Sequence, residues 1–396
     1  MKITDIRSRL VAIPIQAPTR HSYASPTHYI RNIVELFTDE GIVGLGETYS
    51  IVPPSAFEGL KPFLIGKDPF NLEKIRIQIS QRGYFTRQPL LLAPVEFACY
   101  DLQGKKLGLP VYALLGGKVR DRVPMSAYLF YRYNNEKGEG EVTTPKEMVR
   151  FCRDLVKRHG FKTLKLKAGV FDPEHEFETL VALRRAFGSG YRLRIDPNAI
   201  WSPATAIRMG MKLLPSDLEY YEDPTWGISG LARVREKVPI PVATNMSVIE
   251  FEHLGPAVES KAIDCILSDP WYWGGLYYTK VLDMTAKHLG LAVSMHSGVE
   301  FGLGLSIMLH VAVTMPNLVH AIDSHYHHLT GDIIKGAMLQ YDRGSMAPSD
   351  SPGFGVELDE DKMNRYEHEY KTLSRSDYGY PPDPKRPQWY AKVPNW

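Results

Sequence analysis

The sequence is poor in cysteine and carries no excess of charge of either sign. Its 396 residues include three cysteines, and 47 basic side chains against 45 acidic ones leave a formal net charge of +2. Cysteines that are scattered and odd in number give no disulfide framework and no paired-thiol zinc site. A nearly neutral chain without a block of like charges also lacks the electrostatic footprint of a nucleic-acid or membrane-surface protein. We therefore expect no nucleic-acid partner and no membrane partner.

Long apolar runs and targeting signals are lacking as well. No run approaches the roughly 18 apolar residues of a membrane helix, and charges interrupt the first nine residues, which excludes a secretory signal. Hydrophobic residues at 44% and charged residues at 23% are typical of a soluble globular protein. We expect a protein of the reducing cytoplasm whose length fits one α/β barrel with an added domain, or two average domains.

The first third of the chain predicts a small α+β domain. Three segments carry the β-branched and aromatic residues of strands, and a turn ending in Gly41 separates the second from the third. Apolar residues then recur at helical spacing. Strands followed by helices predict an α+β domain over residues 1–120. The predicted strands are Ile3–Pro14, Ile30–Phe37 and Ile42–Glu47, and the helical pattern runs from Leu72 to Leu107.

After residue 120, short apolar runs alternate with stretches of helix length. Eight such runs predict a TIM-type barrel over residues 121–335. An open doubly wound sheet is the alternative, although no glycine-rich phosphate loop follows its first strand. The tail, 336–396, holds one helical stretch and an aromatic end, and we expect it to pack back on the first domain. The predicted strands are Val123–Leu129, Thr163–Lys167, Leu193–Ile195, Leu218–Tyr221, Ile240–Ala243, Ile263–Leu267, Leu291–Ser294 and Val319–Ile322, and the helices include Pro145–His159, Glu174–Phe187, Ser202–Leu214, Tyr277–Leu289 and Glu360–Thr372.

Polar residues end the barrel strands at intervals of one β/α unit. Because the carboxyl ends of barrel strands converge on the top face, these residues are expected to meet in one pocket. The second strand ends with Lys165 and Lys167 on one strand face. On an exposed edge strand such lysines are ordinary gatekeepers, whereas inside a barrel a lysine beside a second cation is a usable base.

Oxygen-bearing side chains end the next three strands. Asp196, Glu222 and Asn245 follow the third, fourth and fifth strand candidates. Each could cap a helix at a strand-to-helix turn. Together they form a set of two carboxylates and one amide, and such oxygen ligands select Mg²⁺ with positions left open for water or substrate.

An aspartate ends the sixth strand, and a histidine ends the seventh. Asp269 can contact His296, fixing the tautomer of the imidazole and stabilising its protonated form. His296 alone is more often a structural residue. With Lys167 on the other side of the metal strands, two bases would face one substrate. Such a site removes the proton beside a carboxylate, and the second base returns a proton or assists a leaving hydroxyl.

These motifs resemble those of the enolase superfamily. The resemblance rests on Lys-x-Lys, Asp-Pro-Asn at 196–198, Glu-Asp-Pro at 222–224, the Asp269–His296 pair and His-Ser at 296–297. Asn245 in Ala-Thr-Asn-Met, Tyr128, the Ala321–His325 segment and Lys-Arg-Pro at 385–387 are similar to its glucarate dehydratase branch. The resemblance implies an α/β fold in which a modified TIM barrel, (β/α)₇β, carries a capping domain built from the N-terminal region and the C-terminal tail.

The resemblance also implies a role for each matching residue. Lys167 is one base with Lys165 as its electrostatic helper, and His296, oriented by Asp269, is the other base and the acid for a departing hydroxyl. Mg²⁺ is the implied cofactor, and a homo-oligomer is expected. The implied Mg²⁺ ligands are Asp196, Glu222 and Asn245, and the implied substrate-binding residues are Tyr128, Asn198, Ser297, His325 and Arg386.

The expected activity is Mg²⁺-dependent dehydration of an acid sugar, with a glucarate-like diacid favoured and a 2-keto-3-deoxy acid as product. An epimerase or racemase of the same superfamily is the first alternative, since two opposed bases suffice for it. A catalytically silent relative and a nucleotide-dependent oxidoreductase are the others. The segment Arg20–Arg31, with Arg20, His21, Tyr23 and His28, either closes over the substrate or is an ordinary polar loop.

Overall fold

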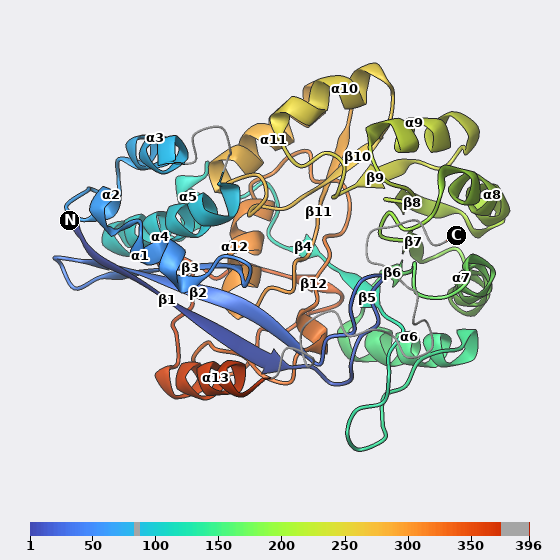
Figure 1. Ribbon diagram of the computed structural model, residues 1–396, viewed down its shortest axis with the longest axis horizontal. Coiled ribbons are helices and arrows are strands. Elements are labelled where there is room, and N and C mark those ends of the chain that lie inside the picture. The colour runs from blue at the N-terminus through green and yellow to red at the C-terminus, as the bar shows by residue number, and fades with distance from the viewer. Residues whose placement is uncertain (83–87, 374–395) are drawn as a thin grey trace.

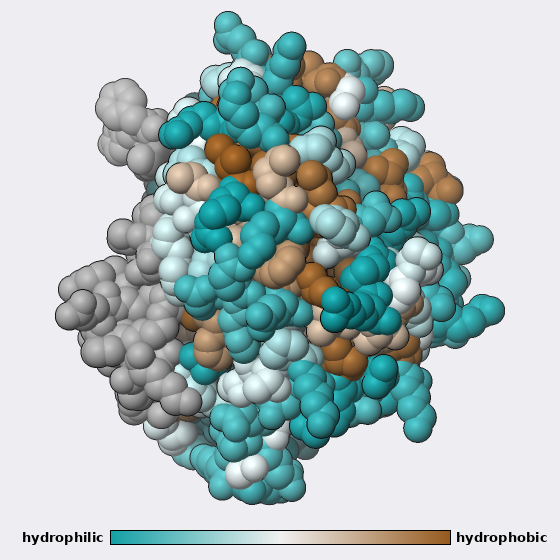
Figure 2. Space-filling view, turned by 90° about the vertical axis from the view of Figure 1, so that its right-hand side faces the viewer, coloured by the Kyte–Doolittle hydropathy of each residue, from teal (hydrophilic) through white to brown (hydrophobic). Residues whose placement is uncertain are grey.

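A computed structural model of the chain describes residues 1–82, 88–373 and 396. Figure 1 shows an antiparallel sheet with helices lying beside a curled parallel sheet that is surrounded by helices. Among the described residues no helix is long and apolar enough to cross a membrane. On the face in Figure 2 apolar side chains form small groups separated by polar ones.

The N-terminal sheet has three strands in the order β1-β2-β3, as the sequence predicts. Gly41, at φ +74°, makes the hairpin turn between β2 and β3. Gly44 and Gly46 let the backbone of α4 approach β3, because a Cβ atom at either glycine would lie 2.2 Å from a helix carbonyl oxygen. The elements are β1 (Ile3–Pro14), β2 (His28–Thr38), β3 (Val43–Tyr49), α1 (Pro54–Glu58), α2 (Lys61–Leu64), α3 (Leu72–Arg82), α4 (Pro89–Leu107) and α5 (Val111–Leu114).

Seven parallel strands form the second sheet, in the order β11-β10-β9-β8-β7-β6-β5, and a helix follows each strand. The sequential strand order, with a helix after each strand, confirms the predicted barrel architecture and excludes a doubly wound sheet. The units are β5 (Ser126–Leu129), α6 (Pro145–His159), β6 (Thr163–Lys167), α7 (Pro173–Phe187), β7 (Arg192–Asp196), α8 (Pro203–Leu213), β8 (Leu218–Glu222), α9 (Ile228–Lys237), β9 (Val242–Thr244), α10 (Leu254–Glu259), β10 (Cys265–Ser268), α11 (Leu276–His288), β11 (Ala292–Met295) and α12 (Gly302–Ala312).

The predicted eighth strand is a bridging segment and not a continuous strand. Residues 318–323 lie between β11 and β5 and make isolated parallel bridges to each. The backbone of Val319 donates to Val293 O at 3.2 Å, and Ser126 N donates to Ile322 O at 2.9 Å. These bonds close the barrel, but the segment makes too few consecutive ladder hydrogen bonds to be a strand.

Local signals explain why the barrel helices begin and end where the sequence predicts. At α6, Thr144 accepts from Glu147 N and the Glu147 carboxylate accepts from Thr144 N, which makes a capping box. Pro145 occupies the first turn, where its missing N–H costs nothing, and Gly160 ends the helix at φ +77°.

The C-terminal helix α13 (Glu360–Thr372) packs against β1 of the N-terminal sheet. Arg9 on β1 forms an ion pair of 2.9 Å with Glu360 in the first turn of α13. At the chain end, Trp396 O accepts from Ser202 N at 2.9 Å, just before α8. The short strands β4 (Val123–Pro124) and β12 (Ser345–Met346) pair with each other in a separate two-stranded sheet.

A buried carboxylate joins the N-terminal helices to the barrel. Glu96 on α4 pairs with Arg76 of α3 at 2.5 Å and accepts from Tyr277 N at the start of α11 at 3.2 Å. Negative charge at a helix N-terminus is favourable because unpaired N–H groups and the helix dipole meet it. Gly275, the residue before α11, has φ +129°, and a Cβ there would lie 1.2 Å from Glu96 Oε2.

Replacing Gly275 by alanine is expected to lower the free energy of unfolding by about 3 kcal/mol or more, since the methyl group collides with Glu96 in a conformation that only glycine adopts easily. Urea denaturation measures the loss. Gly290→Ala is the matched control: Gly290 also has positive φ, +71°, but open space around it, so only about 1 kcal/mol should be lost. Equal losses would contradict the account of the Glu96 contact.

Candidate active site

Alternate residues of the parallel strands place the predicted polar side chains inside one end of the barrel. On β6, Lys165 and Lys167 share a face, and Lys167 lies in register with Asp196 of β7. Glu222 is the last residue of β8, and Asn245 directly follows β9. Strand spacing therefore predicted correctly that these residues meet.

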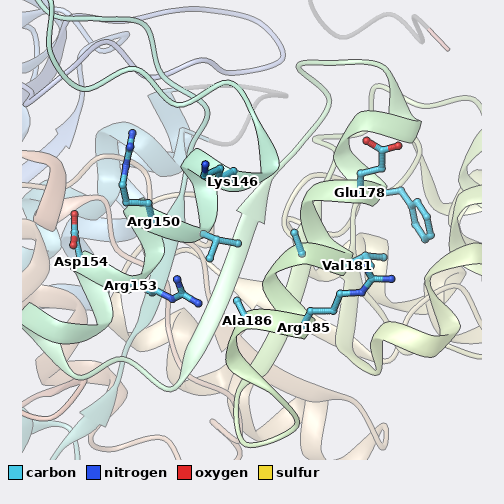
Figure 3. A pocket seen from close by; sticks show the side chains of 11 residues that line it. Lys146, Arg150, Arg153, Asp154, Glu178, Val181, Arg185 and Ala186 are labelled. Atoms are coloured by element: carbon cyan, nitrogen blue, oxygen red, sulfur yellow. The ribbon is translucent and has the colours of Figure 1, made fainter.

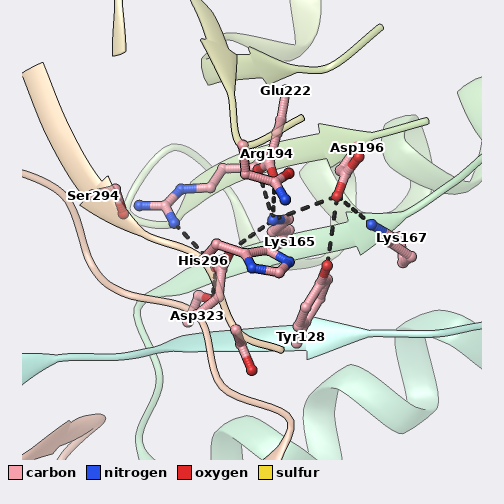
Figure 4. Close-up of polar contacts among 12 residues, drawn as sticks. Tyr128, Lys165, Lys167, Arg194, Asp196, Glu222, Ser294, His296 and Asp323 are labelled. Atoms are coloured by element: carbon pink, nitrogen blue, oxygen red, sulfur yellow. Dashed lines mark hydrogen bonds and ion pairs between the residues drawn. The ribbon is translucent and has the colours of Figure 1, made fainter. Parts of the chain in front are cut away.

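Lys165 lies among three carboxylates (Figure 4). Its Nζ atom is 2.6 Å from Glu222, 2.6 Å from Asp323 and 3.5 Å from Asp196. Lys167 Nζ donates to Asp196 Oδ2 at 2.6 Å and to Asn198 Oδ1 at 2.7 Å. The end of the barrel is thus a buried ionic cluster of two ammonium groups and three carboxylates.

The cluster shifts the pKa values of its members in different directions. Burial alone would lower the pKa of Lys165, but Asp323, Glu222 and Asp196 raise it well above its ordinary value, so this lysine stays cationic. Burial alone would raise the pKa of Asp196, but Lys167 and Lys165 lower it to about 2. Burial, with Asp196 and Asp323 nearby, raises the pKa of Glu222 well above its ordinary value although Lys165 opposes the shift.

The amide of Asn245 completes an oxygen-rich corner that fits a cation. The amide lies 3.3 Å from Glu222 Oε1, 3.0 Å from Asp223 Oδ2 and 3.2 Å from His296 Nε2. Its NH₂ can donate to the two carboxylates, and its oxygen would turn towards a cation bound beside them. Among the described residues no three His, Cys, Asp or Glu side chains are arranged to hold a metal ion, so a Mg²⁺ site here would need the amide oxygen as a ligand.

A histidine–aspartate pair lies beside this corner. His296 follows β11, and its Nδ1 atom is 3.0 Å from Asp269 Oδ2. Asp269 Oδ1 accepts from Trp271 N at 2.8 Å, which fixes the carboxylate. Because a carboxylate only accepts, the Nδ1 atom carries the proton, and Nε2 lies on the side of the ring that faces the Asn245 amide.

The residues expected to contact substrate lie around the same end of the barrel. Tyr128 lies under Lys165, with Nζ 4.7 Å from its ring centroid, and its hydroxyl is 3.5 Å from Asp196 Oδ2. Ser297 Oγ is 2.7 Å from His325 Nδ1. Burial, together with His21, His328, His296 and Lys167 nearby, lowers the pKa of His325 well below its ordinary value, which keeps this ring neutral. Arg386 lies outside the described residues.

Some side chains of the segment Arg20–Arg31 reach the site, and others contact the surrounding protein. His21 lies 4.7 Å from Phe130 between ring centroids, and burial and Lys167 lower its pKa to about 3. Ser22 Oγ accepts from Asn198 Nδ2 at 2.7 Å, so this loop reaches the lysine side of the site. Arg20 instead lies over the rings of Tyr133 and Phe171, and His28 contacts Glu369 of α13.

Four residues that the sequence did not single out join the site. Asp323 binds Lys165, Ser22 binds Asn198, and Glu300 accepts from Ser297 Oγ at 2.8 Å. Tyr49, the last residue of β3, donates to Asp269 Oδ2 at 2.6 Å. Asp323 stands two residues before His325 at a strand end, a signal that could have identified it. Ser22 and Glu300 come from loops and Tyr49 from a strand of the other sheet, and the barrel strand pattern does not encode their approach.

Comparison with known protein families agrees with this geometry. Residues 147–362 match the family model described as "Enolase C-terminal domain-like", and residues 3–116 match the N-terminal domain of mandelate racemase and muconate lactonizing enzyme. The chain belongs to the enolase superfamily. The two matches cover the antiparallel sheet with its helices and the barrel from β6 onward, so the resemblance read from the strand-end motifs is confirmed.

Relatives within the enolase superfamily differ in activity. A protein of Streptomyces coelicolor described as a probable glucarate dehydratase is 39% identical, with 92% of each chain covered. An N-succinyl-L-Arg/Lys racemase of Bacillus cereus is 26% identical over 92% of this chain and 97% of its own. An enolase of Pseudomonas fluorescens, solved with magnesium, potassium and tartrate, has a TM-score of 0.91 at 34% identity and covers 100% and 99% of the two chains.

A separate groove lies on the outside of the enolase-superfamily barrel (Figure 3). It measures about 940 Å³ and runs between α6 and α7, with basic, acidic and apolar side chains lining it. None of the predicted site residues lines it. Its lining includes Lys146, Arg150, Arg153, Phe177, Val181 and Arg185.

Proposed function

We propose that this protein is a Mg²⁺-dependent dehydratase that acts on an acid sugar. It would remove the proton next to a carboxylate, eliminate the β-hydroxyl group and release a 2-keto-3-deoxy acid. One observation carries the proposal: Lys167 contacts Asp196 and His296 contacts Asn245, so the two groups border the proposed ligand set at different members. Two groups able to move protons beside a cation-binding corner are what this elimination requires.

Lys167 is the base that takes the α-proton, and Lys165 stabilises the charge that develops. Losing that proton puts negative charge on the substrate carboxylate, which an always-cationic neighbour favours. The raised pKa of Lys165 suits it to this electrostatic role and not to proton abstraction. Mg²⁺ held by Asp196, Glu222 and Asn245 would supply further positive charge next to that carboxylate.

His296 is the acid that completes the elimination. As the imidazolium it gives its Nε2 proton to the departing β-hydroxyl, which leaves as water, while the α-proton stays on Lys167. The resulting enol then becomes the keto acid by taking up a proton at the β-carbon. Asp269 supports this role because it holds Nδ1 and stabilises the imidazolium.

A hydroxylated diacid is the favoured substrate. We assign Tyr128, Asn198, Ser297 and His325 to its oxygens, and Arg386 to its distal carboxylate. Two comparisons support the assignment: the Streptomyces coelicolor relative is described as a probable glucarate dehydratase, and the Pseudomonas fluorescens structure holds tartrate, itself a hydroxylated diacid.

Epimerisation of an acid substrate is the second candidate. Two bases on opposite sides of an α-carbon suffice to remove a proton from one face and return it to the other. The racemase of Bacillus cereus, 26% identical, favours this candidate.

The purified protein with Mg²⁺ is to be screened against mono- and diacid sugars for keto-acid formation. Turnover of a diacid to a 2-keto-3-deoxy acid is the expected result. Exchange of the α-proton with solvent deuterium, with every hydroxyl retained and no keto acid formed, would overturn dehydration in favour of epimerisation. Neither reaction with any acid sugar would overturn both.

A further inference from the structure

Tyr49 of the N-terminal sheet contacts the aspartate that orients His296. Its hydroxyl donates to Asp269 Oδ2 at 2.6 Å, and His296 Nδ1 lies 3.0 Å from the same oxygen. Asp269 Oδ1 is already held by Trp271 N at 2.8 Å. Tyr272 N also donates to Oδ1, at 3.3 Å, so two donors meet each oxygen and the carboxylate has a single favourable orientation.

The Tyr49 ring is itself held from both sides. The Arg31 guanidinium lies 4.3 Å from the ring centroid, and the Trp271 ring meets it edge-on at 6.1 Å. Arg31 is buried and fixed in turn, donating to Glu47 Oε1 and to Gly298 O, each at 2.9 Å. The hydroxyl is therefore aimed at Asp269 by a rigid set of neighbours.

The loop after β11 leaves room for this hydroxyl. A Cβ atom at Gly298 would lie 1.8 Å from the Tyr49 hydroxyl oxygen. Gly298 stands two residues after His296 and directly after Ser297. A larger residue at this position would push the hydroxyl away from Asp269.

We propose that Tyr49 is a positioning residue for the proton-transfer chemistry of His296. By holding Asp269, it keeps the imidazole in the tautomer with a proton on Nδ1 and with Nε2 directed at the substrate. It contacts neither Lys167 nor the oxygen-rich corner in the described structure, so its influence falls on the His296 side alone. The inference rests on the proposed function, in which His296 moves a proton.

Tyr49→Phe tests the inference, because it removes the hydroxyl and keeps the ring. Exchange of the α-proton with solvent deuterium is to be measured on a pair of acid-sugar substrates that differ only in α-configuration. His296→Asn and Lys167→Ala show which substrate depends on which base. For the His296-dependent substrate, Tyr49→Phe is expected to lower kcat by about 10-fold with KM unchanged, as loss of an orienting hydrogen bond does. The Lys167-dependent substrate should change less than about 2-fold.

Two further variants sharpen the test. Gly298→Ala should reproduce the Tyr49→Phe effect, since its methyl group occupies the place of the hydroxyl. Tyr112→Phe is the matched control, because Tyr112 also donates to an aspartate, Asp350, at 2.6 Å, on the exposed surface. Equal losses for both substrates, or no loss for either, would overturn the positioning role.

Nitrogen NMR of the His296 ring separates this inference from the proposed function. Its signals report the tautomer without any turnover. A single Nδ1-protonated tautomer in the wild type and a mixture in Tyr49→Phe is the expected result. An unchanged tautomer overturns the inference, whereas a changed tautomer in an enzyme indifferent to His296→Asn shows that Tyr49 orients the ring and overturns the proposed function.

Discussion

Replacing Lys167 by alanine lowers kcat for the acid-sugar substrate by about 10³-fold, the scale at which a general base contributes to catalysis. The loss falls on kcat more than on KM, because the ammonium group acts on the α-proton during reaction. Lys165 cannot take over, since Asp323, Glu222 and Asp196 raise its pKa well above the ordinary value. Steady-state kinetics with the keto-acid assay measures the change.

Lys162→Ala is the matched control for this loss. Lys162 precedes β6 on the same stretch of chain but lies exposed at the opposite end of the strand, against the Tyr191 ring. Its removal should leave kcat within about 2-fold, as is usual for exposed positions away from a site. A Lys167→Ala enzyme that is folded and keeps a tenth of the wild-type kcat would rule out this lysine as the base.

Replacing Glu222 by glutamine weakens Mg²⁺ binding on the order of 10²-fold. Loss of a metal ligand should cost at least as much Mg²⁺ affinity as loss of a residue that only orients a ligand. The substitution keeps shape and removes one of the two carboxylates in the proposed ligand set. Because burial, Asp196 and Asp323 raise the pKa of Glu222, a proton competes with Mg²⁺ there. The affinity of the wild type should therefore fall as the pH is lowered.

Calorimetric titration with Mg²⁺ and thermal unfolding with and without it measure this effect. At a Mg²⁺ concentration 100 times the Kd, binding stabilises the wild type by about 2.7 kcal/mol, and Glu222→Gln should lose most of that gain. Glu236→Gln, on the exposed face of α9, serves as the control for the change in charge. Wild-type affinity retained in Glu222→Gln would exclude this carboxylate as a ligand.

The strands of both sheets were largely predictable from the sequence because their residues alternate or run apolar between clear turns. β1 and β6 begin and end where the residue pattern places them. The prediction of a continuous eighth strand was wrong, because residues 318–323 close the barrel through isolated bridges. How many ladder bonds such a segment forms depends on the neighbouring strands.

The centre of the site was predictable for a different reason. Lys167, Asp196 and Glu222 end strands, and the β/α repeat brings strand ends together whatever the intervening loops do. Tyr49 was not predictable, because it stands 220 residues from Asp269 and reaches it only through the packing of the N-terminal sheet on the barrel. Nothing in the local sequence encodes that approach.

The position of deuterium in the product tests the central claim most directly. The diacid sugar is to be turned over in deuterated water with Mg²⁺, and the product analysed by NMR and mass spectrometry. A 2-keto-3-deoxy acid with deuterium at C3 is the predicted result, since elimination forms an enol that takes its new hydrogen from solvent. An acid sugar with every hydroxyl in place and deuterium at the α-carbon would contradict dehydration.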